Sequence, residues 1–163
     1  MNKIPSVIVF LFVSIVVSAT HNRAGEITYK HVSGYIYEIT IITYTYTPSE
    51  ANKSRDVLTL NWGDGSSGNI PRISEEYLPD NFTLNTYKTT HTFPGPGTYT
   101  ISMEDPNRNE GVINIVESVN VPFSISTTLR IDAILGGNTT PVLTNPPVDN
   151  AAIGVKFIHN PAA

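Results

Sequence analysis

The sequence predicts an all-β domain of about seven strands, arranged as two sheets that stack face to face. Apolar and polar residues alternate with a period of two, which is typical of strands with one buried face. Clusters of glycine, proline, asparagine and serine separate these stretches at the short intervals of an all-β domain. Because no single strand can bury its apolar face alone, stacking two sheets is the economical solution.

Seven segments carry the strand pattern. We expect strands at residues 26–32, 35–47, 57–62, 82–93, 98–103, 112–116 and 124–134. In the third segment Leu58, Leu60 and Trp62 share one face, so Trp62 is predicted to lie in the core between the sheets. The polar residues that follow Ser66, up to Pro71, are predicted to form a turn.

The long segment 35–47 carries four tyrosines, and two hypotheses describe them. Tyr35, Tyr37, Tyr44 and Tyr46 would form a face for carbohydrate or protein if they pointed the same way, since tyrosine combines flat apolar area with a polar tip. In a regular strand Tyr35 and Tyr37 would point to one face and Tyr44 and Tyr46 to the other, so a bend would be needed to bring all four to one face. We therefore favour core packing and ordinary strand propensity.

Composition excludes several classes of function. Ten Lys and Arg residues are spread through a chain of net charge -4, without the basic cluster that phosphate binding requires, so we expect no nucleic-acid partner. The chain has no cysteine, so its hydrophobic core must hold the fold without disulfides. A domain of ~110 to 150 residues buries close to two thirds of its unfolded surface, which is enough for independent stability.

The amino-terminal residues are typical of a signal peptide. Lys3 provides the positive start, residues 7–17 are apolar apart from one serine, and Val17-Ser18-Ala19 forms a small-residue cleavage site. The apolar run is shorter than the roughly 18 to 20 residues that span a bilayer, so we expect no membrane span. The sequence predicts a signal peptide at residues 1–19, a mature chain that begins at Thr20, and a location outside the cell or on its outer surface.

Composition changes again near Gly136. The following residues are rich in proline, asparagine and glycine and have almost no alternation, which indicates a linker or an extended edge segment. The strand pattern then resumes at residues 153–158 and stops at Ala163. We expect one domain at residues 20–137, and at residues 138–163 a linker and the start of a truncated second domain. Neighbouring domains of a longer chain would then be its first partners.

Two glycine-rich stretches, LNWGDGSSG and HTFPGPGTY, contain the most distinctive residues of the chain. A phosphate-binding loop would need a lysine beside the last glycine and a helix after it, and neither follows Gly65. Asp64-Gly65 is instead a favoured pair for a tight turn, and the Asp64 carboxylate can accept hydrogen bonds within that turn. Pro94-Gly95-Pro96-Gly97 is predicted to form a second turn before the next strand.

These stretches resemble the polycystic-kidney-disease (PKD) domain, an immunoglobulin-like two-sheet β-sandwich of cell-surface proteins. Trp62-Gly63-Asp64-Gly65-Ser66 is followed, in the order and at the separation of that family, by His91-Thr92-Phe93 and by a segment from Pro96 to Ile101. The usual form of the first motif is shortened here, and Asn61 stands where the family often has aspartate. The resemblance implies a structural motif of eight residues: Trp62, Gly63, Asp64, Gly65, His91, Pro96, Gly97 and Tyr99.

A second resemblance extends over most of the chain after Ala19. It is carried by Ala24-Gly25-Glu26-Ile27-Thr28-Tyr29, Tyr37-Glu38-Ile39-Thr40, Asp105-Pro106-Asn107-Arg108-Asn109, Pro141-Val142-Leu143 and Asn145-Pro146-Pro147. These segments are similar to the amino-terminal module of large surface proteins of gliding bacteria. The resemblance implies adhesin-like proteins with PKD- and cadherin-like repeats, exported by type IX secretion through a carboxy-terminal gliding-motility-associated segment. The second domain expected here would be cadherin-like.

The sequence offers no catalytic set. Its four histidines lack the paired spacing of a zinc site, and no cysteine can serve as ligand or nucleophile. Asp64, Glu104 and Asp105 would form a general acid/base pair only if the two loops that carry them met. We therefore predict no enzyme, no catalytic residue and no cofactor.

Calcium is the alternative for a functional site. Glu104, Asp105 and Asn107, with Asn109, offer hard oxygen ligands within one short loop. Asp-Pro-Asn is equally typical of a plain turn, and Arg108 lies among the candidate ligands, so we predict that the loop binds no metal.

These observations together predict a non-catalytic extracellular module, a spacer or adhesion domain of a secreted or cell-surface protein, with surface polysaccharide or protein as possible partners. The alternative is a carbohydrate-binding accessory module of a secreted hydrolase. The reading frame beyond Ala163 would distinguish them, because it would end either in a gliding-motility-associated segment or in a catalytic domain.

Overall fold

The computed structural model describes residues 22–106, 108–109, 111–112, 114–145 and 153–156. The predicted signal peptide, the candidate ligand Asn107 and most of the expected second domain lie outside these residues. No helix within the described ranges is long and apolar enough to cross a membrane.

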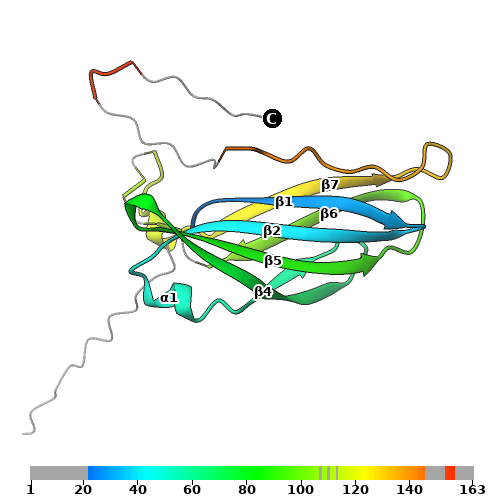
Figure 1. Ribbon diagram of the computed structural model, residues 1–163, viewed down its shortest axis with the longest axis horizontal. Helices are drawn as coiled ribbons and strands as arrows, with labels where there is room; N and C mark the ends of the chain where they lie inside the picture. The colour runs from blue at the N-terminus through cyan, green and yellow to red at the C-terminus, as the bar shows by residue number, and fades with distance from the viewer. Residues whose placement is uncertain (1–21, 107, 110, 113, 146–152, 157–163) are drawn as a thin grey trace, which may run out of the picture.

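Seven antiparallel strands make one sheet in the order β1-β2-β5-β4-β3-β6-β7 (Figure 1). Their bounds are β1 Asn22–Ser33, β2 Ile36–Tyr46, β3 Val57–Asn61, β4 Ser67–Leu78, β5 Phe82–Thr92, β6 Gly97–Asp105 and β7 Phe123–Ile131. A short helix, α1 (Glu50–Lys53), and two 3-10 turns, η1 (Pro79–Asn81) and η2 (Ser118–Asn120), lie in the connections. The predicted all-β class is confirmed.

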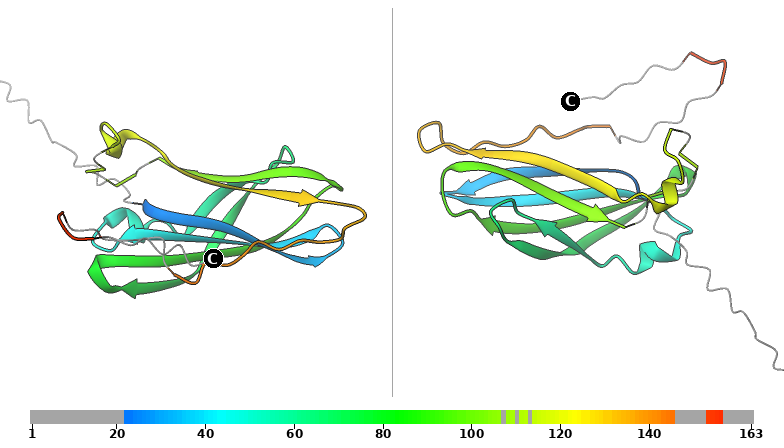
Figure 2. Two further views of the ribbon diagram at one scale, coloured as in Figure 1. Left: turned by 90° about the horizontal axis from the view of Figure 1, so that it is seen from above. Right: turned by 180° about the vertical axis from the view of Figure 1, so that it is seen from behind.

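Strand β4 joins the two halves of the sheet. Its first residues pair with β3, ending at Pro71 opposite Val57, and its later residues pair with β5, beginning at Arg72 opposite Tyr87. A register shift follows between Arg72 and Ser74, where the strand bends. The sheet therefore folds over and nearly closes, so that β6 and β7 face β1, β2 and β5 across the interior (Figure 2).

The prediction of strand positions was correct for six segments and wrong in two places. Residues 112–116 form no strand in the described positions: Gly111 and Glu117 have positive φ angles of 81° and 49°, and such a backbone interrupts an extended chain. The first residues of strand β4, up to Pro71, were wrongly predicted to be a turn, and its remaining residues were not predicted to be a strand. Pro71 is tolerated within it because it lies where β4 changes from one partner to the other.

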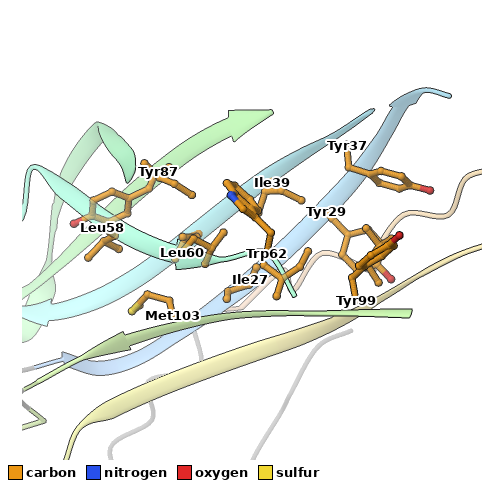
Figure 3. Packing of buried hydrophobic residues seen from close by; sticks show 14 of the residues in the cluster. Ile27, Tyr29, Tyr37, Ile39, Leu58, Leu60, Trp62, Tyr87, Tyr99 and Met103 are labelled. Carbon is orange, nitrogen blue, oxygen red and sulfur yellow. The ribbon is translucent and has the colours of Figure 1, made fainter. Parts of the chain in front are cut away.

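The core fills the space inside the folded sheet (Figure 3). Alternate residues of β2 point inward, with Tyr37, Ile39 and Ile41 fully buried. Trp62 is 5% exposed and lies in the same cluster as Leu58 and Leu60, as the pattern of its segment predicts.

The long strands give the molecule two distinct ends. The turn end carries the tight connections β1–β2, β3–β4 and β5–β6 and the residues that follow β7. The α1 end carries α1, η1 and the long β6–β7 connection. The candidate residues divide between these two ends.

A segment after β7 runs back along the free edge of β1. Thr140 donates its N–H to the Tyr29 carbonyl at 3.0 Å, and its Oγ1 accepts the Tyr29 N–H at 3.0 Å. Thr139 Oγ1 accepts the His31 N–H at 3.4 Å, so the segment is antiparallel to β1. These bonds cover an edge that would otherwise expose unpaired backbone groups. Thr139 and Thr140, which follow the domain boundary predicted at residue 137, are thus hydrogen-bonded to β1. The boundary itself stays a prediction.

Candidate functional site

The predicted turn after β3 is held by its own polar side chains. Asp64 Oδ1 accepts the Ser66 N–H at 2.9 Å and the Ser66 hydroxyl at 2.6 Å, while Asn61 Oδ1 accepts the Gly63 N–H at 2.9 Å. Gly63 and Gly65 have φ angles of 79° and 91°, a region that glycine enters without strain. A Cβ on Gly63 would lie 2.6 Å from the backbone nitrogen of Thr100, so the turn packs closely against β6.

Asp64 and His91 form an ion-pair geometry that links this turn to β5. His91 Nε2 lies 2.8 Å from Asp64 Oδ2, and only 8% of the Asp64 side chain is exposed. Burial raises the pKa of Asp64, but hydrogen bonds from the Ser66 hydroxyl, the His91 ring and the Ser66 N–H, with the charge of His91, outweigh it and hold that pKa at about 2. The carboxylate therefore stays ionised at neutral pH.

The other side of His91 belongs to an aromatic stack. The Trp62 and His91 rings are parallel within 3°, with centroids 4.2 Å apart, and Phe93 meets His91 edge to face at 4.7 Å. Phe93 in turn contacts Tyr99 at 4.7 Å. A Cβ on Gly68 would lie 3.1 Å from the Trp62 ring, so β4 passes close beneath the indole. The two sequence motifs are thus one contiguous structural unit.

The second turn completes this unit. Tyr99 donates its hydroxyl to the Gly95 carbonyl at 2.9 Å, closing the β5–β6 connection. A Cβ on Gly97 would lie 3.2 Å from the Tyr99 hydroxyl oxygen, so the ring covers that glycine. Pro96 is exposed at the tip of the turn. The eight motif residues therefore all lie at the turn end, and seven of them are in mutual contact or in the tight turn itself.

The candidate acid/base set is not assembled. Asp64 lies at the turn end, whereas Glu104 and Asp105 are the last residues of β6, at the α1 end. Both carboxylate oxygens of Asp64 are engaged within the motif, Oδ1 by Ser66 and Oδ2 by His91 Nε2, and Trp62 covers one face of the imidazole. This arrangement fixes a turn and a strand to each other.

The candidate calcium residues are also separated. Asp105 is buried and accepts two hydrogen bonds from Arg55, Nε to Oδ2 at 2.7 Å and Nη2 to Oδ1 at 3.3 Å. Glu104 is exposed on the other face of β6, since neighbouring residues of a strand point to opposite faces. Asn109 accepts a hydrogen bond from the Ser118 hydroxyl at 2.8 Å through its main-chain oxygen. Within the described ranges, no three His, Cys, Asp or Glu side chains form a group that could hold a metal ion.

Sequence reasoning missed a buried polar network at the α1 end. Asn85 donates to Thr45 Oγ1 at 3.0 Å and to Asn52 Oδ1 at 3.2 Å, and it accepts from Arg72 Nη1 at 2.9 Å. Asn52 donates to Glu75 Oε1 at 3.0 Å. Every second residue of β2 points inward, and this series continues from the apolar residues to Thr45. The position of Thr45 in the series could therefore have indicated that polar side chains enter the interior.

Tyr87 joins this network to the apolar core. Its hydroxyl donates to the Arg55 carbonyl at 2.7 Å, and the residue is fully buried. Burial raises the pKa of Tyr87 to about 12, although the nearby positive charge of Arg72 opposes the shift. Tyr87 is therefore a neutral hydrogen-bond donor at physiological pH.

As we expected, the four tyrosines of segment 35–47 do not form a common exposed face. Tyr37 points into the core and is fully buried, whereas Tyr44 is buried on the other face of β2. Tyr35 is 41% exposed at the turn end, and Tyr46 lies at the opposite end of the strand beneath the Arg23 guanidinium, 5.5 Å from the ring centroid.

Comparison of the chain with protein-family models, with curated proteins and with solved structures finds no match. The resemblance to PKD domains and to surface proteins of gliding bacteria rests on the sequence segments that carry it.

Proposed function

We propose that this chain is a non-catalytic module of an exported protein, an immunoglobulin-like domain of the PKD type that serves as a spacer and adhesion module at a cell surface. The observation that carries the proposal is the unit formed by Trp62, Asp64 and His91. His91 contacts both the Asp64 carboxylate and the Trp62 indole, with Trp62 buried and Asp64 and His91 partly buried. Groups engaged in this way stabilise a fold, which supports a structural role for the motif.

The attachment of β1 supports a role as a spacer. Strand β1 pairs with β2 from Asn22 to Ser33 on one edge, and Thr139 and Thr140 bond its other edge. A chain pulled from its amino-terminal side would have to break this ladder before the core opened. A domain that transmits force in a surface protein requires such resistance.

The sequence features supply the rest of the proposal. The signal-peptide pattern at residues 1–19 supports export, and the segments shared with surface proteins of gliding bacteria support type IX secretion and cadherin-like neighbours in the same chain. The partners would be those neighbouring domains, together with a polysaccharide or protein on the opposing surface.

Export is tested on intact cells that make the full-length protein. External protease should release or cleave it, and amino-terminal sequencing of the surface-exposed protein should begin at Thr20. A protein that is protected from protease in intact cells and still begins at Met1 would contradict the proposal.

The non-catalytic role is tested by Asp64→Asn and His91→Gln in the full-length protein. We expect adhesion of the cells to fall only in proportion to the folded fraction, measured by thermal unfolding of the same variants. A loss of function in fully folded variants would indicate that Asp64 and His91 do chemistry, and the proposal would then be abandoned.

A further inference from the structure

A pocket opens at the turn end, between the β1–β2 turn and the residues that follow β7. Its volume is about 220 Å³, and one side is open to solvent. Its walls include His31, Tyr35, Tyr37, Asp132, Gly136 and Gly137. Sites for drug-sized ligands measure about 300 to 1,000 Å³, so this pocket has room for a single small ring or for the end of a larger molecule.

Tyr37 supplies an unused hydrogen-bonding group at this pocket. The residue is fully buried, and its hydroxyl has no hydrogen-bond partner among the residues that the structure describes. Its ring is held edge to face by Tyr29 at 6.1 Å and by Phe93 at 5.9 Å, and Figure 3 shows the hydroxyl pointing along the strands toward their end. An unpaired buried hydroxyl is costly, so a ligand that pairs with it gains affinity.

Asp132 adds an oriented carboxylate to the walls of the pocket. Asp132 Oδ1 accepts the N–H groups of Ile134 at 2.9 Å and Leu135 at 3.2 Å, and these bonds hold the pKa of Asp132 below its usual value. Arg130 Nη2 lies 3.4 Å from Asp132 Oδ2 and offsets its charge. With a balanced charge on this wall, the pocket favours a neutral ligand with hydroxyl groups over an ion.

Aromatic surface and close backbone packing shape the rest of the pocket. Tyr35 is 41% exposed beside it and offers a flat apolar ring. Gly137 lies so close to His31 that an added Cβ would overlap the imidazole, and the His31 ring is itself fixed by a 2.9 Å contact between Nε2 and the Gly34 carbonyl oxygen. The walls are therefore defined in shape before any ligand arrives.

We propose that this pocket binds the terminal residue of a neutral saccharide. A sugar ring has apolar C–H faces that suit Tyr35, and it has hydroxyl groups that suit both the Tyr37 hydroxyl and the Asp132 carboxylate. The inference rests on the proposed adhesion function and names the ligand class for it. The same class would suit the alternative role, an accessory module of a hydrolase.

The course of the chain leaves this end free for binding. Strand β1 begins at the α1 end, and the segment through Thr139 and Thr140 runs back along β1 toward that same end. Both connections of the described domain therefore lead away from the pocket. A domain held from its α1 end would present the turn end to an opposing surface.

The test uses the full chain and five neutral sugars: glucose, galactose, mannose, xylose and N-acetylglucosamine. Each is titrated in the millimolar range while backbone amide resonances are recorded by NMR. We expect at least one sugar to shift the amides of Gly34, Gly136 and Gly137 in a saturable way. Tyr37→Phe should weaken that binding about tenfold, as expected when a hydrogen bond in a dry site is lost. The matched control is Tyr77→Phe, because Tyr77 is 70% exposed and lies outside the pocket.

Two results would overturn the proposal. One is that none of the five sugars shifts these amides. The other is that N-acetyl-leucine amide shifts them and Leu135→Ser abolishes that effect, while Tyr37→Phe does not, since Leu135 is an exposed apolar residue next to Gly136 in the chain and a peptide would bind there. Neither result would contradict the proposal that the protein is exported to the cell surface. Conversely, sugar binding by a protein that is not exported would refute the proposed function and not the pocket.

Discussion

The two ends of this molecule close the same folded sheet by opposite means. At the turn end, aromatic rings and one ion-pair geometry pack beneath tight turns. At the α1 end, Asn52, Arg72 and Asn85 form a buried polar network with Thr45 and Glu75. The difference follows from what the connections carry inward: the tight β3–β4 and β5–β6 connections bring in the aromatic residues Trp62 and Phe93, whereas the longer β2–β3 connection brings in the polar residue Asn52.

The comparison also separates two kinds of stability. Apolar packing at the turn end depends on area and shape, and it tolerates no loss of volume. The polar network depends on complete pairing, because removing one member leaves several buried groups without partners. Substitutions at the two ends should therefore differ in how much stability they remove.

Replacing Trp62 with alanine should lower the free energy of unfolding by about 3 to 5 kcal/mol, because it removes a buried indole and leaves His91 without its stacking partner. Chemical denaturation measures the loss, and the native fluorescence of the wild type should be blue-shifted. Tyr77→Ala is the control, and its exposed side chain should change stability by less than about 0.5 kcal/mol. An equal effect of both variants would mean that Trp62 does not anchor the turn end.

Asn85→Leu should lower the free energy of unfolding by about 1 to 3 kcal/mol, although leucine is apolar and similar in volume. The cost arises because Thr45, Asn52 and Arg72 each lose a hydrogen bond to Asn85 in a buried position. Thr90→Ala, at an exposed position of the same strand, is the control. If Asn85→Leu were as stable as the wild type, the α1 end would be held by apolar packing like the turn end.

The pH dependence of stability should carry a contribution from Asp64. Its folded pKa of about 2 lies below its ordinary value of 3.8, so its stabilising effect is complete above pH 3.8 and is lost as the pH falls toward 2. In Asp64→Asn, unfolding curves should show a weaker loss of stability between these two pH values. Asp80→Asn, at an exposed turn position, should keep the wild-type profile. Identical profiles for wild type and Asp64→Asn would show that the contacts of the Asp64 carboxylate with Ser66 and His91 contribute no net stability.

Calcium should have the smallest effect. The full chain is expected to melt at the same temperature in millimolar calcium and in a chelator, because Arg55 occupies both carboxylate oxygens of Asp105. Binding to the folded state would stabilise it by about 2.7 kcal/mol at a hundredfold excess over the dissociation constant. A rise of that size, abolished by Asp105→Asn, would reinstate the loop of Glu104 and Asp105 as a site.

Local chemistry made much of the turn end predictable. Asp64-Gly65 indicates its own turn, and alternation places Trp62 on the face of Leu58 and Leu60, because both features depend on residues a few positions apart. The α1 end was missed for the opposite reason. The Thr45 side chain enters a polar interior only because Asn52 and Asn85 come to it from other elements.

The order of residues along the chain was enough to predict the all-β class, most strand positions, the tight turns and the inward face of Leu58, Leu60 and Trp62. Three features depend on the folded chain and could not be predicted: β4 changes partners at Pro71, Asp105 pairs with Arg55, and Tyr37 and Asp132 line one pocket. Backbone conformation and alternation are set by neighbours in the chain. Contacts across the folded sheet join residues as distant in sequence as Tyr29 and Thr140, which are 111 positions apart. Which distant residues come into contact depends on how the whole sheet closes.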